Sequence, residues 1–231
     1  MLFRSQLATA VTARGNFGAN DLLIIDGGGN DAASLVGAYV NAAKDGGKAY
    51  QGVLATQLTT AQLTPIATAC AAPTSAACQQ ALAGAGATYM TALADTFYGQ
   101  IKGSALDKGA QKVVVLNMPG ITNTPRFQTV LDAIAAANGG GTTGATARAS
   151  ALALFDGWVK AFNAQLATRF SGNSSVVVVD FYTAFNDEIN APAQYGLTNV
   201  KTPACPITGV GSDGLPTYTF ATCTEIGRAH V

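Results

Sequence analysis

The sequence has few charged side chains, and they cancel. Only 11% of its 231 residues are charged, and 13 lysine and arginine residues balance 13 aspartate and glutamate residues. A chain without excess positive charge has no electrostatic basis for binding nucleic acid or an anionic membrane surface. No apolar run approaches the roughly 20 residues that span a bilayer. We therefore expect no nucleic-acid partner and no integral membrane segment in this chain.

Histidine is almost absent, and Cys-x-x-Cys pairs are missing altogether. The one histidine is His230, close to the end of the sequence. Zinc sites are built from histidine and cysteine at short spacing, so we expect no metal, and we expect no other cofactor. The first residues, Met1-Leu-Phe-Arg-Ser-Gln, lack the basic front, apolar centre and cleavage site of a signal peptide. Taken alone, that absence predicts the cytoplasm.

The four cysteines contradict a cytoplasmic location. On a continuous helix Cys70 and Cys78 would lie about 12 Å apart, which is beyond the reach of a disulfide. The segment 71–75 contains a proline and can turn the chain between two helices, while Cys205 and Cys223 bracket a loop rich in glycine and proline. We predict the disulfides 70–78 and 205–223, which are typical of an oxidising compartment. The alternative is four free thiols packed as small apolar groups.

One stretch organises the chain: Asp21-Leu-Leu-Ile-Ile-Asp-Gly-Gly-Gly-Asn-Asp31. The continuous apolar run Leu22–Ile25 predicts a parallel strand with both faces covered. Three glycines follow, and then Asn30 and Asp31 stand just past the carboxyl end of the strand. Open α/β sheets place their ligands at that end. Apolar residues at helical spacing in 32–43 predict the crossover helix.

The rest of the chain repeats the alternation of strands and helices. Apolar runs predict further strands at 112–117 and 175–180. This order is typical of a parallel sheet with right-handed crossovers, so we predict one α/β domain over residues 1–224. Further helices are expected at 2–13, 58–69, 79–102, 126–137 and 152–170, loops at 44–52 and 138–144, and largely irregular chain from residue 186.

These motifs resemble a known family. Gly28-Gly-Asn30-Asp31 after a buried strand is similar to the Gly-x-Asn-Asp block of the SGNH hydrolases, also called the GDSL esterase/lipase family. The second strand runs into Asn117-Met-Pro-Gly120 and the third into 180–187, as in that family. Tyr195–Cys205 is similar to the segment that precedes the catalytic Asp/His block in secreted bacterial members. The resemblance implies a secreted or periplasmic protein with a flavodoxin-like, three-layer α/β/α fold.

The resemblance also implies an activity, the hydrolysis of carboxylic esters of small molecules or lipids by a serine, a histidine and an aspartate. Asn30 would donate its side-chain amide in the oxyanion hole, supported by Gly28 and Gly29 in the turn before it. For Asp31 we expect a structural role, capping the helix that begins beside it. On the local residues alone, an Asx-type turn that closes the strand is the better reading of Asn30.

Two blocks of the family are missing from the sequence. Ser5, in Phe-Arg-Ser-Gln, is not the Gly-Asp-Ser nucleophile block, and His230 follows Gly227 where the family has an aspartate. A catalytic triad therefore cannot be assembled from this chain. Residues 225–231 back-translate into common sequencing-adapter DNA and are predicted to be a non-native tail. We expect a fragment truncated at both ends that is aggregation-prone, inactive alone and left with an unpaired edge at Leu22–Ile25.

Two other classes are compatible with the sequence. In a phosphate-binding α/β domain, Gly27–Gly29 would cradle an anion at the helix start. The glycines after this strand do not form Gly-x-Gly-x-x-Gly, the chain has no P-loop lysine, and Asp26 and Asp31 would repel phosphate. The glycine-, alanine- and threonine-rich loops also suit a noncatalytic secreted adhesion module.

Overall fold

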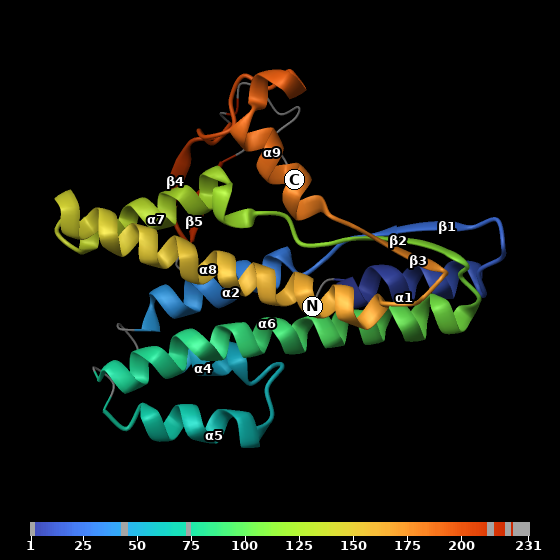
Figure 1. The fold of residues 1–231 in the computed structure, drawn as a ribbon, viewed down its shortest axis with the longest axis horizontal. Helices are drawn as coiled ribbons and strands as arrows, with labels where there is room; N and C mark the ends of the chain where they lie inside the picture. The colour runs from blue at the N-terminus through green and yellow to red at the C-terminus, as the bar shows by residue number, and fades with distance from the viewer. Residues whose placement is uncertain (1–2, 43–45, 73–74, 212–214, 220–222, 224–231) are drawn as a thin grey trace.

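The computed structural model describes most of the chain (Figure 1). The described residues are 3–42, 46–72, 75–211, 215–219 and 223. They form a helix-rich α/β structure that includes a small parallel sheet. The predicted class, α/β with a parallel sheet, is therefore confirmed.

The sheet has three strands in the order β1-β2-β3. They are β1 (Leu22–Ile25), β2 (Lys112–Leu116) and β3 (Val176–Val179), and both pairings are parallel. β2 is the central strand because it pairs with β1 on one side and with β3 on the other. Among the described residues β1 pairs with β2 and with no further strand. Its second edge is therefore open, as the sequence predicts.

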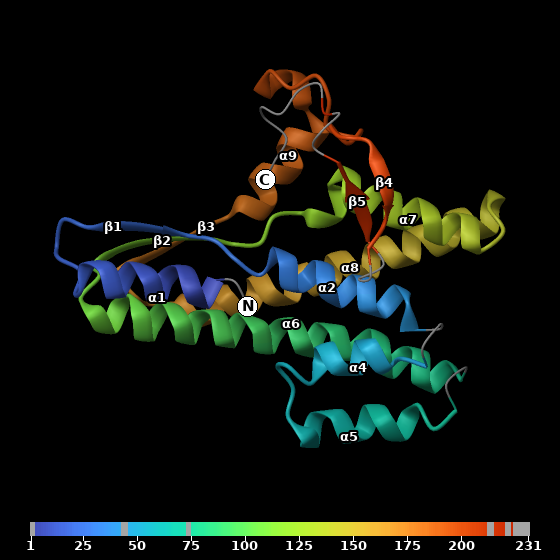
Figure 2. The same cartoon turned by 180° about the vertical axis from the view of Figure 1, so that it is seen from behind.

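Eight α-helices occur in the described residues, two of them about 30 residues long. Three short 3-10 helices, η1 (Leu106–Lys108), η2 (Ile121–Asn123) and η3 (Pro192–Tyr195), join other elements. An antiparallel hairpin of β4 (Ile207–Val210) and β5 (Pro216–Tyr218) packs beside α7 (Figure 2). The α-helices are α1 (Phe3–Arg14), α2 (Gly29–Val40), α4 (Lys48–Leu54), α5 (Thr60–Ala69), α6 (Ala76–Ser104), α7 (Pro125–Ala137), α8 (Gly141–Phe170) and α9 (Phe181–Asn190).

The core extends from one face of the sheet, along the long helices α6 and α8, to the packed helices α2, α4 and α7. On this face Ile25, Val113 and Val115 are buried. α6 and α8 run side by side (Figures 1 and 2), and the indole Nε1 of Trp158 donates to the carbonyl of Ala83 over 3.0 Å. Aromatic rings pack between these helices, as in the edge-to-face pair of Tyr98 on α6 and Phe170 on α8, whose ring centroids are 5.1 Å apart.

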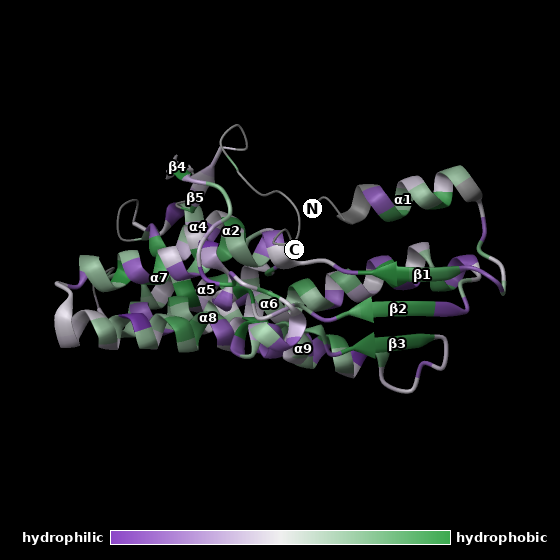
Figure 3. Cartoon of the chain, turned by 90° about the horizontal axis from the view of Figure 1, so that it is seen from above, coloured by the Kyte–Doolittle hydropathy of each residue, from purple (hydrophilic) through white to green (hydrophobic). Residues whose placement is uncertain are grey.

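The opposite face of the sheet is uncovered. Leu22, Ile24 and Val177 are 60, 67 and 61% exposed, and Figure 3 shows an apolar sheet surface with no helix over it. The prediction that both faces of β1 are covered is wrong, because α6 and α8 lie beneath the sheet and α1 lies along the β1 edge. The described residues thus form two layers at the sheet, and the predicted three-layer arrangement is not observed in them.

Two predicted loops contain helices instead. α4 begins at Lys48, within the predicted loop 44–52, because Tyr50 and Leu54 on it are fully buried and packing outweighs the local glycines. α8 begins at Gly141, where the sequence predicts the loop 138–144. Gly144 packs so closely on the Ala135 carbonyl that a Cβ there would lie 2.5 Å from the oxygen.

The region from residue 186 onward is more regular than predicted. α9 continues to Asn190, η3 follows it, and the β4–β5 hairpin is the last regular element in the described residues. Residues 225–231, including His230, lie outside the described residues, as does Ser5's side chain. No described helix is both long enough and apolar enough to pass through a bilayer.

Both predicted disulfides are present. Cys70 and Cys78 are bonded with their Cα atoms 4.4 Å apart, joining the end of α5 to the start of α6. Cys205 and Cys223 are bonded with a Cα separation of 4.6 Å. The bond between Cys70 and Cys78 is possible because α5 ends at Ala69 and α6 begins at Ala76, so the two cysteines do not lie on one continuous helix. Two disulfides are compatible with an oxidising compartment.

Candidate functional site

The exit of β1 is a tight turn that strongly favours glycine at position 28. Gly28 is the N-cap of α2 with φ 91°, in the left-handed region. A Cβ at this position would lie 2.9 Å from Met118 Cε and 3.2 Å from Phe162 Cζ. The Gly28 carbonyl accepts the N–H of Ala32 over 2.9 Å, which is the first turn of the helix. The left-handed backbone thus favours glycine at position 28, and the end of the Met118 side chain would have to move to admit a Cβ there. Gly29 is the first residue of α2.

Asn30 lies in the first turn of α2 and is exposed. Its side chain has no hydrogen-bond partner among the described residues, and no side chain caps the helix at Gly28. The first N–H groups of a helix have no partner within it and carry the positive end of the helix dipole. Asn30 therefore presents a free amide at a site that already favours negative charge.

Asp31 also lies in this first turn, but it does not cap the helix as predicted. The N-cap is Gly28, so Asp31 is three residues inside the helix. Its side chain is half-buried, and this burial raises the pKa of the carboxyl above its usual value. A carboxylate in the first turn interacts favourably with the helix dipole. Its negative charge also opposes a phosphate at this helix start, which disfavours the phosphate-binding alternative.

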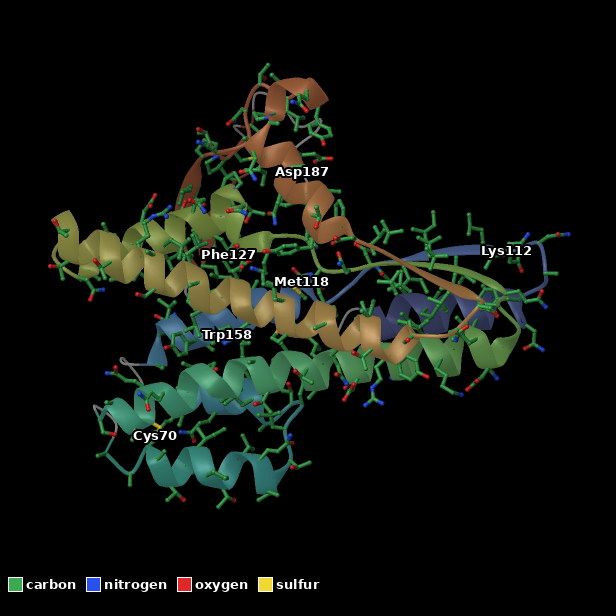
Figure 4. All side chains as sticks on the ribbon, viewed as in Figure 1. Cys70, Lys112, Met118, Phe127, Trp158 and Asp187 are labelled. Atoms are coloured by element: carbon green, nitrogen blue, oxygen red, sulfur yellow. A yellow bond between two sulfur atoms is a disulfide. The ribbon has the colours of Figure 1, made fainter. Side chains whose placement is uncertain are left out.

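The exit of β2 is held by a side chain from α8. The N–H of Met118 donates to Oδ1 of Asn163 over 2.8 Å, and Nδ2 of Asn163 donates to the Met118 carbonyl over 2.8 Å. Figure 4 shows Met118 where the strand exits meet α8. One amide therefore satisfies both backbone polar groups of a buried residue just past the strand.

The residue that follows β3, Asp180, is the N-cap of α9. Asp180 accepts the backbone N–H of Thr183 over 3.2 Å and the Thr183 hydroxyl over 2.6 Å, and so caps α9. The Asn117 amide donates to the same carboxylate over 3.0 Å. The Thr183 hydroxyl, then Asn117 and the Thr183 N–H, lower the pKa of Asp180 below its usual value. Asp180 is thus ionised at neutral pH in a structural role.

A second carboxylate near these exits is also fully paired. The Tyr182 hydroxyl donates to Oδ1 of Asp156 over 2.6 Å, and Lys160 lies 2.7 Å from Oδ2. Burial, followed by the hydrogen bond to Asp156, raises the pKa of the Tyr182 phenol. Because Asp156 is already engaged by two partners, we assign it to packing α9 against α8.

A groove runs along the open edge of β1. It has a volume of about 330 Å³, and its walls come from α1, from the loop before β1 and from the strand itself. It follows the strand as far as Asp26, so it ends close to the turn that carries Asn30. The lining residues are Gln6, Leu7, Ala10, Phe17 and 21–26.

The described part of the chain contains no histidine and no cluster of three or more His, Cys, Asp or Glu that could hold a metal. The structure brings together Gly28, Gly29 and Asn30, which the sequence singles out, and adds Asn163, which it does not. The one available signal for Asn163 is a polar residue on the apolar stripe of α8, beside Phe162 and Leu166. The arrangement can donate hydrogen bonds to an anion.

No family model, curated protein or solved structure matches this chain. Functional inference therefore depends on the site geometry and on the motif resemblance described above.

Proposed function

We propose that this chain carries the oxyanion-hole side of a serine carboxylic ester hydrolase of the SGNH type. The observation that carries the proposal is the position of Asn30. Its amide is exposed and free of partners among the described residues, at the carboxyl end of a parallel strand. Ester hydrolysis passes through a tetrahedral intermediate whose oxygen becomes negative, and amide donors fixed in advance stabilise that charge.

The start of α2 strengthens this role. Asn30 stands among the first N–H groups of a 12-residue helix, whose dipole is positive at this end. The backbone of the same turn packs closely, because Gly28 lies against Met118 and Phe162. A packed turn limits the movement of the Asn30 backbone, and limited reorganisation is what an oxyanion hole requires.

The open edge of β1 supports the same proposal. In the family that the motifs resemble, a strand carrying the nucleophilic serine belongs beside this one. The groove between α1 and β1 offers unpaired backbone groups of Leu22–Ile25 and an apolar floor at Leu7 and Ala10. Because parallel strands end at the same edge of a sheet, a residue at the end of such a strand would lie beside Asn30. Under this proposal, the serine and histidine come from outside the described residues.

The finer features of the fold and location belong to the same proposal. The uncovered face around Leu22, Ile24 and Val177 is where a third layer would pack. The disulfides favour a secreted or periplasmic protein. The substrate is a small-molecule or lipid ester, since the proposed donor recognises the developing oxyanion that all such esters share.

The experiment compares this chain with the complete product of its gene. Both are treated with a fluorophosphonate, which labels activated serines, and assayed with a short-chain aryl ester. We expect the complete product to be labelled and to hydrolyse the ester, while the chain alone does neither. A complete product that neither reacts with the fluorophosphonate nor hydrolyses the ester would overturn the proposal. Turnover by the chain alone would contradict our placement of the nucleophile.

A further inference from the structure

We propose that Asn163 is a positioning residue for Asn30. It acts through Met118, which in turn supports the Gly28 turn. The inference rests on the proposed oxyanion role of Asn30, and its structural part can be tested without any activity.

The first step is the contact between Asn163 and Met118. β2 ends at Leu116, and the N–H of Asn117 still pairs with the Val179 carbonyl across the sheet. Met118 is the first residue beyond this pairing, and Asn163 satisfies both its N–H and its carbonyl at 2.8 Å. A planar amide that makes both bonds fixes the position and the direction of this backbone.

The second step is the contact between Met118 and Gly28. Met118 is 1% exposed, and its Cε is the atom closest to where a Cβ of Gly28 would stand, at 2.9 Å. The ring of Phe162 lies against the same point at 3.2 Å. The Gly28 turn therefore packs against the side chains of Met118 and Phe162. Since Asn30 follows two residues later, a displacement of Met118 changes the direction of its amide.

The position of Asn163 is fixed by the packing of its neighbours on α8. Phe162 and Leu166, which flank Asn163 on the helix, are fully buried, and Val159 is nearly so. A half-buried amide between buried neighbours has little freedom to move. Asn163 thus transmits the position of α8 to the exits of both β2 and β1.

An ordinary structural role for Asn163 makes a different prediction. If it merely satisfies the backbone of a buried turn, its loss lowers stability and leaves the environment of Asn30 unchanged. If it positions Asn30, its loss alters the Asn30 environment in a protein that is still folded. The test must therefore report on Asn30 itself.

The primary test is the Asn163→Asp variant of this chain, followed by ¹⁵N NMR of the Asn30 side-chain amide. An ionised aspartate can accept from the Met118 N–H, but it has no donor for the Met118 carbonyl. A protonated aspartate has one donor and one acceptor and can restore both bonds. We expect the Asn30 and Gly28 resonances to shift at neutral pH and to return toward their wild-type values as the introduced carboxyl is protonated.

Neighbouring acidic groups require a reference at each pH. Carboxyls near these exits belong to Asp31 on α2, Asp156 on α8 and Asp180 before α9. Asp156 also forms an ion pair with Lys160 and accepts a hydrogen bond from Tyr182. Every spectrum of the variant is therefore compared with wild type at the same pH. Asn138→Asp is the matched control, because the Asn138 amide also donates to a backbone carbonyl, that of Ile134 at 2.8 Å, but at the far end of α7.

Two outcomes decide the structural claim. A folded Asn163→Asp protein with unchanged Asn30 and Gly28 resonances would overturn it. If that variant does not fold, Met118→Leu tests the same path, because it keeps the backbone contact with Asn163 and removes Cε. Unchanged Gly28 and Asn30 resonances in Met118→Leu would equally overturn the claim.

The catalytic consequence is measured in the complete gene product. We expect Asn163→Asp to lower kcat about tenfold with KM nearly unchanged, as misplaced catalytic groups do. Resonance shifts in a protein without esterase activity would refute the proposed function and leave the positioning role intact. An active enzyme whose kcat is unaffected by Asn163→Asp would refute the positioning of Asn30 for catalysis.

Discussion

Asn117 and Asp180 join the exits of two neighbouring strands, with Nδ2 of Asn117 donating to Oδ1 of Asp180 over 3.0 Å. The other side of the Asn117 amide, Oδ1, accepts the backbone N–H of Tyr182 over 2.7 Å. Asn163 holds the next residue of the β2 exit in the same manner, with both ends of one amide engaged. Two asparagines thus fix the carboxyl end of the sheet, and a third, Asn30, is left with its amide free.

Asp180→Ala is expected to destabilise the protein by about 1 kcal/mol, the usual cost of losing a helix N-cap. Its measure is the free energy of unfolding in urea at pH 7. Because Asp180 has a lowered pKa in the folded state, its contribution is present above the unfolded pKa of about 4 and is lost as the pH falls toward the lower folded value. The difference between wild type and Asp180→Ala should therefore shrink below pH 4. Asp187→Ala, an exposed position on α9, is the control.

Gly28→Ala and Gly29→Ala form a matched pair at the β1 exit. Alanine at position 28 must adopt φ 91° and displace Met118, so we expect a loss of about 1–3 kcal/mol. Alanine at position 29 meets no atom within 4 Å and should leave stability unchanged or raise it slightly. Thermal melting of both variants provides the comparison. Equal melting temperatures would show that Gly28 is not required for its backbone conformation.

How much of the fold the sequence predicts depends on the range of the interactions that form each element. β1 is predicted residue for residue, and β2 and β3 to within a residue at their ends, because each is a short apolar run between breakers. α4 is missed because burial of Tyr50 and Leu54 by distant parts of the chain overrides a glycine-rich local sequence. The exposed face of β1 is missed for a related reason, since an apolar run shows what a strand can bury and not what lies over it.

The same distinction between local and long-range interactions applies to the candidate site. Asn30, Gly28 and Gly29 lie within one short motif, so their proximity follows from the sequence alone. The partners of Asn163 and Asn117 lie 45 or more residues away, and no local pattern links them. Contacts of this kind depend on how α8 packs against the strand exits. The sequence therefore identifies the proposed donor, while its supports are visible only in the structure.

The uncovered sheet face predicts a difference between neighbouring residues of β1. Ile24→Thr replaces an exposed side chain, so we expect less aggregation and nearly unchanged stability. Ile25→Thr places a hydroxyl in the core and should cost about 2 kcal/mol. Light scattering and urea unfolding measure the two effects. If Ile24→Thr is as destabilising as Ile25→Thr, that face is covered in solution.

Removing the disulfides should lower stability according to the loops that they close. The chain-entropy relation gives about 2.6 kcal/mol for the Cys70–Cys78 bond and about 3.2 kcal/mol for Cys205–Cys223. Each bond is removed separately by a double substitution. The two variants are Cys70→Ser with Cys78→Ser and Cys205→Ser with Cys223→Ser. Unfolding of the two double variants under oxidising conditions is the measurement. No change in either would indicate that the thiols are unpaired in the native protein.

The most direct test of the central claim is the kcat of the complete gene product with Asn30→Ala, using a short-chain aryl ester. Loss of one oxyanion donor typically costs 10²–10³ in kcat, or about 2.7–4 kcal/mol, so we predict a fall of that size with KM little changed. Asn20→Ala, another exposed asparagine just before β1, should retain wild-type kinetics. A kcat for Asn30→Ala within twofold of wild type would contradict the role of Asn30 in stabilising the oxyanion.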